Sequence, residues 1–141
     1  MQIATSKNSM KISNRPYIVV ENIRPTPFEP EMFEIMNYGT TPSFHTKIFY
    51  SVAEGGDDFT PNRTYQDSII TQSVIGLTDH PRGVSLVREI GYPEQYQNQA
   101  IFCYGEVAYV DIFNDKHGYR FCFQTTDGYN WKKYKNYNYA F

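Results

Sequence analysis

The sequence predicts an all-β protein, an immunoglobulin-like antiparallel β-sandwich of about seven to eight strands. Three observations support this fold class. Short segments of alternating apolar and polar residues recur along the chain, glycine and proline stand between them, and no segment has a strong helical period. The 13 tyrosines and 10 phenylalanines add to this pattern, because aromatic residues favour strands. A small closed β-barrel is the alternative.

Length and charge narrow the classes of protein further. A chain of 141 residues suffices for one domain with its own core. We expect a flexible N-terminal arm over residues 1–14, one sandwich domain over 15–135 and a C-terminal tail over 136–141. The net charge of -2 gives no overall attraction to nucleic acid or an anionic membrane. No apolar run approaches the roughly 20 residues of a membrane helix, so we expect a soluble chain without membrane insertion, and the cytoplasm is favoured.

The first half of the chain predicts three strands in sequence. Tyr17–Ile23 is apolar and β-branched, and the following proline-rich segment, PTPFEP, cannot continue a strand ladder. Phe33–Tyr38 is the second strand, and turn residues separate it from the third, Ser43–Val52. One face of the third strand is expected to carry Phe44, Ile48 and Tyr50.

The middle of the chain is harder to interpret. Residues 54–64 are a polar loop, and residues 64–93 have no clear period. For that region we expect strand, loop and strand, with one helical turn as an alternative. A polar linker over residues 93–99 then leads into a long strand, Ala100–Phe113, in which Gly105 is expected to form a bulge or bend.

The strongest signal is a hairpin between this long strand and a second one that begins at Tyr119. Turn residues 114–118 join the two, and Tyr109, Phe121 and Phe123 are predicted to share one buried face. A loop at 114–118 would place Cys122 opposite Val110. The two thiols would then lie roughly 23 Å apart, which is too far for a disulfide, so we expect two free, buried cysteines. A last short strand over 129–134 precedes a frayed end.

Three segments resemble a known family. RPYIV at residues 15–19, NYGTTP at 37–42 and the hairpin motif at 105–122 are similar to the C-terminal domain of a group of uncharacterised bacterial membrane-anchored proteins. The resemblance implies an immunoglobulin-like sandwich and no assigned activity. The membrane helix and helical stalk of that group have no counterpart here, which favours a trimmed or free-standing version.

The sequence contains no recognisable catalytic or metal-binding motif. His45, His80 and His117 lack metal-ligand spacing, and Cys122 lies mid-strand between phenylalanines, where a thiol is ordinarily inert. The sequence therefore predicts a protein that is not an enzyme and has no cofactor or metal. The run from Glu54 to Asp58 has two interpretations, a Ca²⁺ loop or a solvated acidic loop, and the second is favoured because the carboxylates lack the usual spacing.

The C-terminal run is the candidate binding surface, because its aromatic residues are interleaved with lysines. Such a run can stack on bases or sugars, or form a protein-binding patch. Its alternative is an edge strand whose aromatic rings cover the core while the lysines face water. The predicted binding residues are Tyr129, Trp131, Lys132, Lys133, Tyr134 and Lys135.

Three functions are compatible with these features. The leading one is a non-catalytic immunoglobulin-like interaction module that binds a protein or a cell-surface component. The second is a free-standing effector or inhibitor, carried by a mobile element, that acts on a bacterial enzyme or signalling ligand. The third is an oligonucleotide- or glycan-binding β domain. A protein is therefore the expected partner, with nucleic acid or glycan as alternatives.

Overall fold

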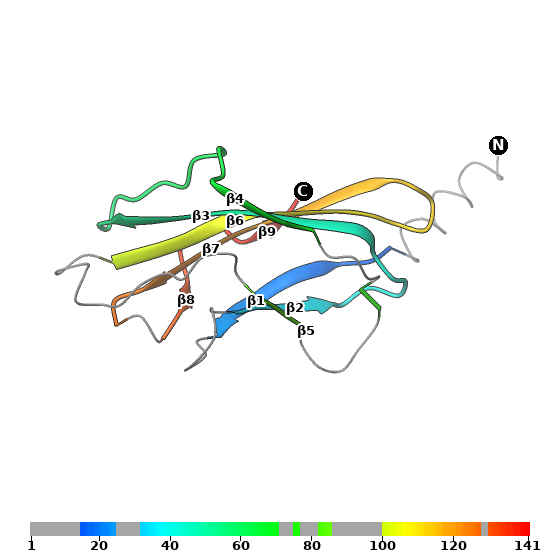
Figure 1. The fold of residues 1–141 in the computed structure, drawn as a ribbon, viewed down its shortest axis with the longest axis horizontal. Coiled ribbons are helices and arrows are strands. Elements are labelled where there is room, and N and C mark those ends of the chain that lie inside the picture. The colour runs from blue at the N-terminus through cyan, green and yellow to red at the C-terminus, as the bar shows by residue number, and fades with distance from the viewer. Residues whose placement is uncertain (1–14, 25–31, 71–74, 77–81, 86–99, 128–129) are drawn as a thin grey trace.

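The computed structural model describes residues 15–24, 32–70, 75–76, 82–85, 100–127 and 130–141. These residues form two antiparallel sheets and no helix, and the sheets face each other without closing into a barrel (Figure 1). The prediction of an all-β sandwich is confirmed, and the barrel alternative is wrong. The expected N-terminal arm, the PTPFEP segment and the linker at 93–99 lie outside the described residues.

Nine strands are described. The small sheet has the order β1-β2-β5, with bounds Ile18–Arg24, Met32–Asn37 and Arg82–Ser85. The large sheet has the order β4-β3-β6-β7-β8, and β9 also pairs with β7. The bounds of these strands are Asp67–Ile70 for β4, Phe44–Gly55 for β3, Ala100–Val110 for β6, Lys116–Thr125 for β7, Lys132–Lys133 for β8 and Tyr139–Ala140 for β9.

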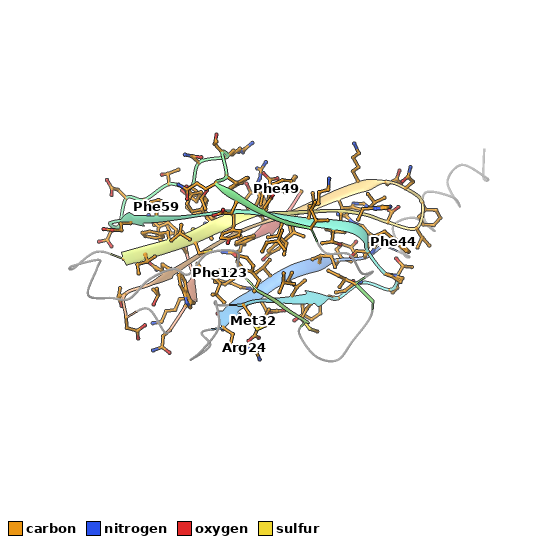
Figure 2. All side chains as sticks on the ribbon, in the orientation of Figure 1. Arg24, Met32, Phe44, Phe49, Phe59 and Phe123 are labelled. Atoms are coloured by element: carbon orange, nitrogen blue, oxygen red, sulfur yellow. The ribbon has the colours of Figure 1, made fainter. Side chains whose placement is uncertain are left out.

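The inner core lies between the two sheets, because alternate residues of β1, β2, β3, β6 and β7 point into that space. Phe33 of the small sheet makes edge contacts with Tyr50 and Phe121 of the large sheet, at ring-centroid distances of 5.3 and 5.2 Å. Tyr109, Phe121 and Phe123 are buried in this same core, which confirms the predicted hairpin face. Figure 2 shows the side chains that fill the space between the sheets.

A second group of aromatic residues, the outer cluster, covers the opposite face of the large sheet. Its buried members are Phe102, Tyr104, Cys122 and Tyr134. The loop after β3 folds over this face, and its Phe59 stacks on Phe102 at 4.0 Å. The large sheet is therefore covered on both faces, with the small sheet on one side and the loop and C-terminal segment on the other.

The C-terminal residues 136–141 pack against the domain, contrary to the expected frayed end. Phe141 N–H donates to the Gly118 carbonyl at 2.9 Å, and Gly118 N–H donates back to the Phe141 carbonyl at 3.1 Å. Tyr137 stacks on Tyr134 with an interplanar angle of 10°. Backbone pairing with β7 and aromatic stacking together hold this segment in place.

The hairpin register differs from the predicted one. Val110 pairs with Lys116, so the loop spans residues 111–115 and not 114–118. Cys122 consequently lies opposite Tyr104, and Cys103 lies opposite Phe123. Both thiols are buried and outside any disulfide, as predicted, but their predicted separation along the strands was wrong. They remain apart because Cys103 points into the inner core and Cys122 into the outer cluster, on opposite faces of one sheet.

Gly105 does not form a bulge, since the pairing of β6 with β3 and β7 is continuous through it. A Cβ atom at Gly105 would overlap the Phe49 carbonyl oxygen, so glycine is needed for close approach of the two strands. The irregularity in β3 lies instead between Phe44 and Lys47, where His45 has a φ of 50°. The bulge leaves Phe44 half-buried, while Ile48 and Tyr50 are fully buried as predicted.

The described parts of residues 64–93 agree with the expected strand, loop and strand. β4 extends the large sheet beside β3, and β5 extends the small sheet beside β2. Between them, Ile75 forms an isolated bridge with Ser43 and is buried in the inner core. This region therefore contributes one strand to each sheet.

Candidate functional site: a groove between the sheet edges

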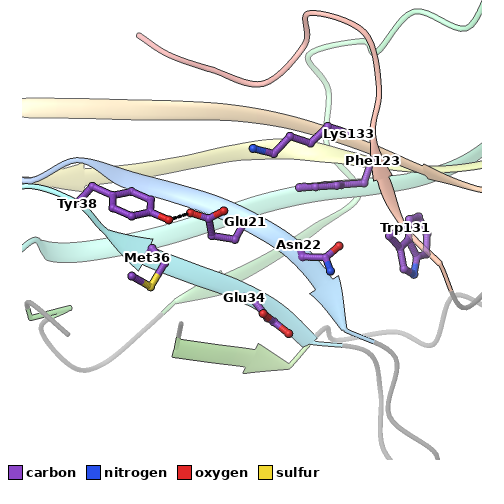
Figure 3. A pocket seen from close by; sticks show the side chains of 8 residues that line it. All are labelled: Glu21, Asn22, Glu34, Met36, Tyr38, Phe123, Trp131 and Lys133. Carbon is purple, nitrogen blue, oxygen red and sulfur yellow. Dashed lines mark hydrogen bonds between the residues drawn. The ribbon is translucent and has the colours of Figure 1, made fainter. Parts of the chain in front are cut away.

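A groove runs along the side of the sandwich where the edge strands β1 and β8 face each other. It consists of two adjoining cavities of about 500 and 780 Å³, which share Asn22 and Trp131. The first is also lined by Glu21, Glu34, Met36, Tyr38, Phe123 and Lys133 (Figure 3). The second is also lined by Ile23, Arg24, Gln124, Thr125, Thr126, Asp127, Asn130 and Lys132.

One wall of the groove is β1, whose only strand partner in the described structure is β2. An edge strand offers unpaired backbone N–H and C=O groups along its free side. The Ile18 N–H donates to the Tyr109 hydroxyl of the large sheet at 3.4 Å. The β1–β2 register shifts between Val20 and Asn22, so β1 is bulged at Glu21. From Glu21 to Arg24, β1 lines the two cavities and has no second strand partner among the described residues.

The opposite wall is Trp131, which lies where the two cavities meet. Its side chain is 7% exposed and belongs to the inner core. Its indole Nε1 is buried and has no hydrogen-bond partner within the described residues. Buried indole N–H groups are normally paired, and an unpaired one costs roughly 1–3 kcal/mol. Within the described residues the indole N–H is thus an unpaired donor inside the core, and Trp131 also lines both cavities.

The two cavities carry opposite charge. Two carboxylates, Glu21 and Glu34, line the first cavity together with the single ammonium of Lys133. The Tyr38 hydroxyl donates to the Glu21 carboxylate, and this hydrogen bond raises the pKa of Tyr38. Figure 3 shows the Glu21 carboxylate turned toward the Tyr38 hydroxyl, with this hydrogen bond drawn as a dashed line.

In the second cavity, two cations face one carboxylate. The cations are Arg24 and Lys132, and the carboxylate is Asp127. The Asp127 carboxylate already accepts two hydrogen bonds from Asn130, one from the backbone N–H at 2.8 Å and one from the side chain at 2.6 Å. By formal charge this cavity is net cationic and its neighbour net anionic, and an ion pair joins them, with Arg24 Nε 3.7 Å from Glu34 Oε1.

The residues predicted from the C-terminal run do not form one surface. Trp131 faces the inner core, whereas Tyr134 is buried in the outer cluster and its hydroxyl donates to the carbonyls of Asp57 and Phe59, at 3.0 and 2.9 Å. Lys135 donates to the Asp57 carbonyl at 2.7 Å. Lys132 and Lys133 are exposed on β8. Tyr129 lies outside the described residues.

This placement corresponds to the edge-strand alternative, in which the aromatic rings cover the core and the lysines face water. Of the six predicted residues, Trp131, Lys132 and Lys133 reach the groove. The residues that complete it, among them Glu21 and Asn22 of β1 and Tyr38 just after β2, were missed. They lie about a hundred positions earlier in the chain, and only strand packing brings them to β8.

The other candidate chemistries find no support in the described residues. No three His, Cys, Asp or Glu side chains among them are grouped as metal ligands. The acidic loop instead uses the Asp57 carbonyl to accept hydrogen bonds from the C-terminal segment. His117 contacts the Asp111 carboxylate at 2.7 Å in the hairpin loop, and His80 is outside the described residues.

Comparisons with protein-family models, with curated proteins and with solved structures found no match. The described part of the chain contains no helix of the length and apolarity that crossing a membrane requires. The resemblance to the bacterial membrane-anchored group therefore stays a prediction.

Proposed function

We propose that this protein is a non-catalytic interaction module that binds an extended segment of a partner protein in the groove between β1 and β8. The observation that carries the proposal is the edge of β1, which has no second strand partner among the described residues and lies beside two joined cavities. An extended segment can pair with a free strand edge through its backbone while alternate side chains enter pockets. An immunoglobulin-like scaffold is compatible with this role, because such sandwiches bind through edges and loops.

The charges of the groove indicate which segment fits. The carboxylates of the first cavity favour a lysine or arginine side chain of the partner, and the cations of the second favour an aspartate or glutamate. Trp131, between them, supplies an aromatic wall that a residue of the partner would pass. The expected ligand is therefore an extended segment with one basic and one acidic side chain, separated by a residue that passes Trp131.

An array of extended ten-residue peptides, with a basic and an acidic residue at varied spacing, tests the proposal by amide chemical-shift mapping. We expect saturable shifts at Glu21, Asn22 and Lys133 for peptides that carry both charges. The variant Lys132→Glu, which replaces a cation of the second cavity by a carboxylate, should weaken binding at least tenfold. The matched control is Lys116→Glu, which reverses an exposed charge on the distant hairpin and should leave the affinity unchanged.

Two outcomes contradict the proposal. One is the absence of saturable shifts on β1 and β8 with every peptide in the array. The other is equal weakening by the groove variant and the hairpin control, which would indicate a general charge effect and no defined site.

A further inference from the structure

A third cavity lies on the outer face of the large sheet, away from the groove. Its volume is about 200 Å³. The floor is formed by β6 and β7 at Tyr104 and Arg120, one wall by the loop from Thr60 to Tyr65, and the other wall by Tyr137 and Tyr139. Sites for drug-sized ligands usually measure about 300–1,000 Å³. This cavity is smaller, so it has room for a single ring.

Tyrosine rings supply most of the lining. Tyr65 and Tyr104 lie at a ring-centroid distance of 6.3 Å with tilted planes, and Tyr137 and Tyr139 approach from the C-terminal segment. Each ring offers an apolar face, and each hydroxyl can donate and accept one or more hydrogen bonds. Burial, and secondly the charge and hydrogen bond of Glu106, raise the pKa of Tyr65 to about 12. Its hydroxyl therefore stays protonated throughout the neutral range.

Arg120 is the principal donor at the floor. Its Nη1 donates to the Tyr139 hydroxyl at 2.9 Å, and its Nε is buried without a partner in the described part of the chain. The guanidinium lies 4.3 Å from the centroid of the Phe141 ring, which fixes its plane. A guanidinium carries five N–H donors in a rigid fork, so Arg120 can serve Tyr139 and a ligand at the same time.

Charges of both signs surround the cavity. Arg63 and Arg120 line it, and Glu106 lies directly opposite Arg120 in the β6–β7 register, with its carboxylate also in contact with Tyr65. The two guanidiniums offer hydrogen-bond donors, and the tyrosine hydroxyls both donate and accept. The lining therefore matches a ring that has apolar faces and carries several hydrogen-bonding groups at its edge.

We propose that this cavity binds one sugar ring, free or as the end residue of a glycan. The C–H faces of the sugar pack on the tyrosine rings, and its hydroxyls exchange hydrogen bonds with Arg120 and with the hydroxyls of Tyr65 and Tyr139. A site of this size that engages only one ring gives weak binding, with a Kd on the order of 1 mM.

The test is amide chemical-shift titration of the whole chain with glucose, galactose, mannose and N-acetylglucosamine, and with uracil and adenine as ring-bearing competitors that contain no sugar. We expect at least one sugar to cause saturable shifts at Tyr104, Arg120 and Tyr137. Tyr139→Ser should raise that Kd at least fivefold. Tyr17→Ser is the matched control, because Tyr17 and Tyr139 are each 39% exposed and each lies beside an arginine guanidinium.

A second variant is needed because Tyr139 lies in β9, so Tyr139→Ser changes the packing of that strand as well as the cavity. Tyr65→Phe keeps the ring and removes only the hydroxyl, so it should also weaken sugar binding while the shifts of β9 stay those of the parent chain. Absence of saturable shifts with all four sugars overturns the proposal. Saturable shifts with a free base but with no sugar overturn it as well, because they would define a base-stacking site.

Discussion

Asp111 organises the β6–β7 loop through hydrogen bonds to both of its carboxylate oxygens. Oδ1 accepts the N–H groups of Phe113 at 2.8 Å and Asp115 at 3.0 Å, and Oδ2 lies 2.7 Å from His117 Nε2. Asn114, with a φ of 63°, completes the turn. The carboxylate therefore takes up backbone donors that a tight loop would otherwise leave unpaired.

Asp111→Asn should destabilise the protein by about 2 kcal/mol at pH 7, since hydrogen bonds to charged groups are the stronger ones. Burial alone would raise the pKa of Asp111, but the hydrogen bonds from His117, Asp115 and Phe113 outweigh it and lower the pKa below its ordinary value. A carboxyl group whose pKa is lower in the folded than in the unfolded chain stabilises the fold at pH values above its unfolded pKa. This stabilisation is lost as the pH falls through the folded pKa. Urea unfolding should therefore show the parent and variant converging below about pH 4.

The matched control for this change is Asp58→Asn, on the exposed loop after β3. It should alter the unfolding free energy by less than about 0.5 kcal/mol. A constant difference between Asp111→Asn and the parent from pH 7 to pH 2 would show that the ionised carboxylate is not what stabilises the loop.

Phe121 tests the inner core, where it contacts Phe33 across the sheets and is 2% exposed. Phe121→Ala should lower the unfolding free energy by about 3–5 kcal/mol, because it removes buried apolar surface and leaves a cavity. Ile112→Ala, at a site that is 49% exposed, should cost less than about 0.5 kcal/mol. Chemical denaturation measures both, and a loss under about 1 kcal/mol at Phe121 would mean that its face is not the buried one.

The alternation of apolar and polar residues predicted those strands whose own sequence shows it clearly. β1, β2 and β3 lie within a few residues of their predicted bounds, and the aromatic face of β7 was correctly oriented. β9 was missed because a strand of two residues is too short to show a period. Its place is set by pairing with β7, where Phe141 bonds to Gly118, and these two residues are distant from each other in sequence. The hairpin register was missed because the side chain that sets it, Asp111, lies at the start of the loop and not among the usual turn residues.

Gly105 allows β6 and β3 to approach closely, and replacing it should destabilise the pairing of these two strands. In Gly105→Ala the new methyl would overlap the Phe49 carbonyl oxygen and lie 2.8 Å from Tyr50 Cα, and neither backbone atom can rotate away. We expect a loss of at least about 2 kcal/mol in thermal or urea unfolding. Gly76→Ala is the control, because nothing lies within 4 Å of the position that its methyl would take. Equal stability of the two variants would contradict the close-approach role.

At the scale of the whole molecule, the groove and the outer cavity are both products of layer packing. The groove combines β1 with β8, and the outer cavity combines the loop after β3 with the C-terminal segment. The sequence pointed to the aromatic C-terminal run as a candidate binding surface, but it could not show which face of the large sheet each ring covers. The reason is physical: Trp131 and Tyr134 enter opposite cores, and the direction of each depends on the strand β8 that pairs with β7.

The same layering predicts that the two thiols become reactive in a fixed order. Burial raises the pKa of Cys122 to about 12, so neither its access nor its ionisation favours reaction in the native state. Cys122 is covered by the outer cluster, whose cover is a loop and a short C-terminal segment, whereas Cys103 lies between the sheets. Opening of loops and termini costs less free energy than separation of core strands. Pulsed alkylation in rising urea, read by peptide mass spectrometry, should therefore label Cys122 at lower urea than Cys103, and labelling of both thiols at one urea concentration would show that the cover and the sandwich open as a single unit.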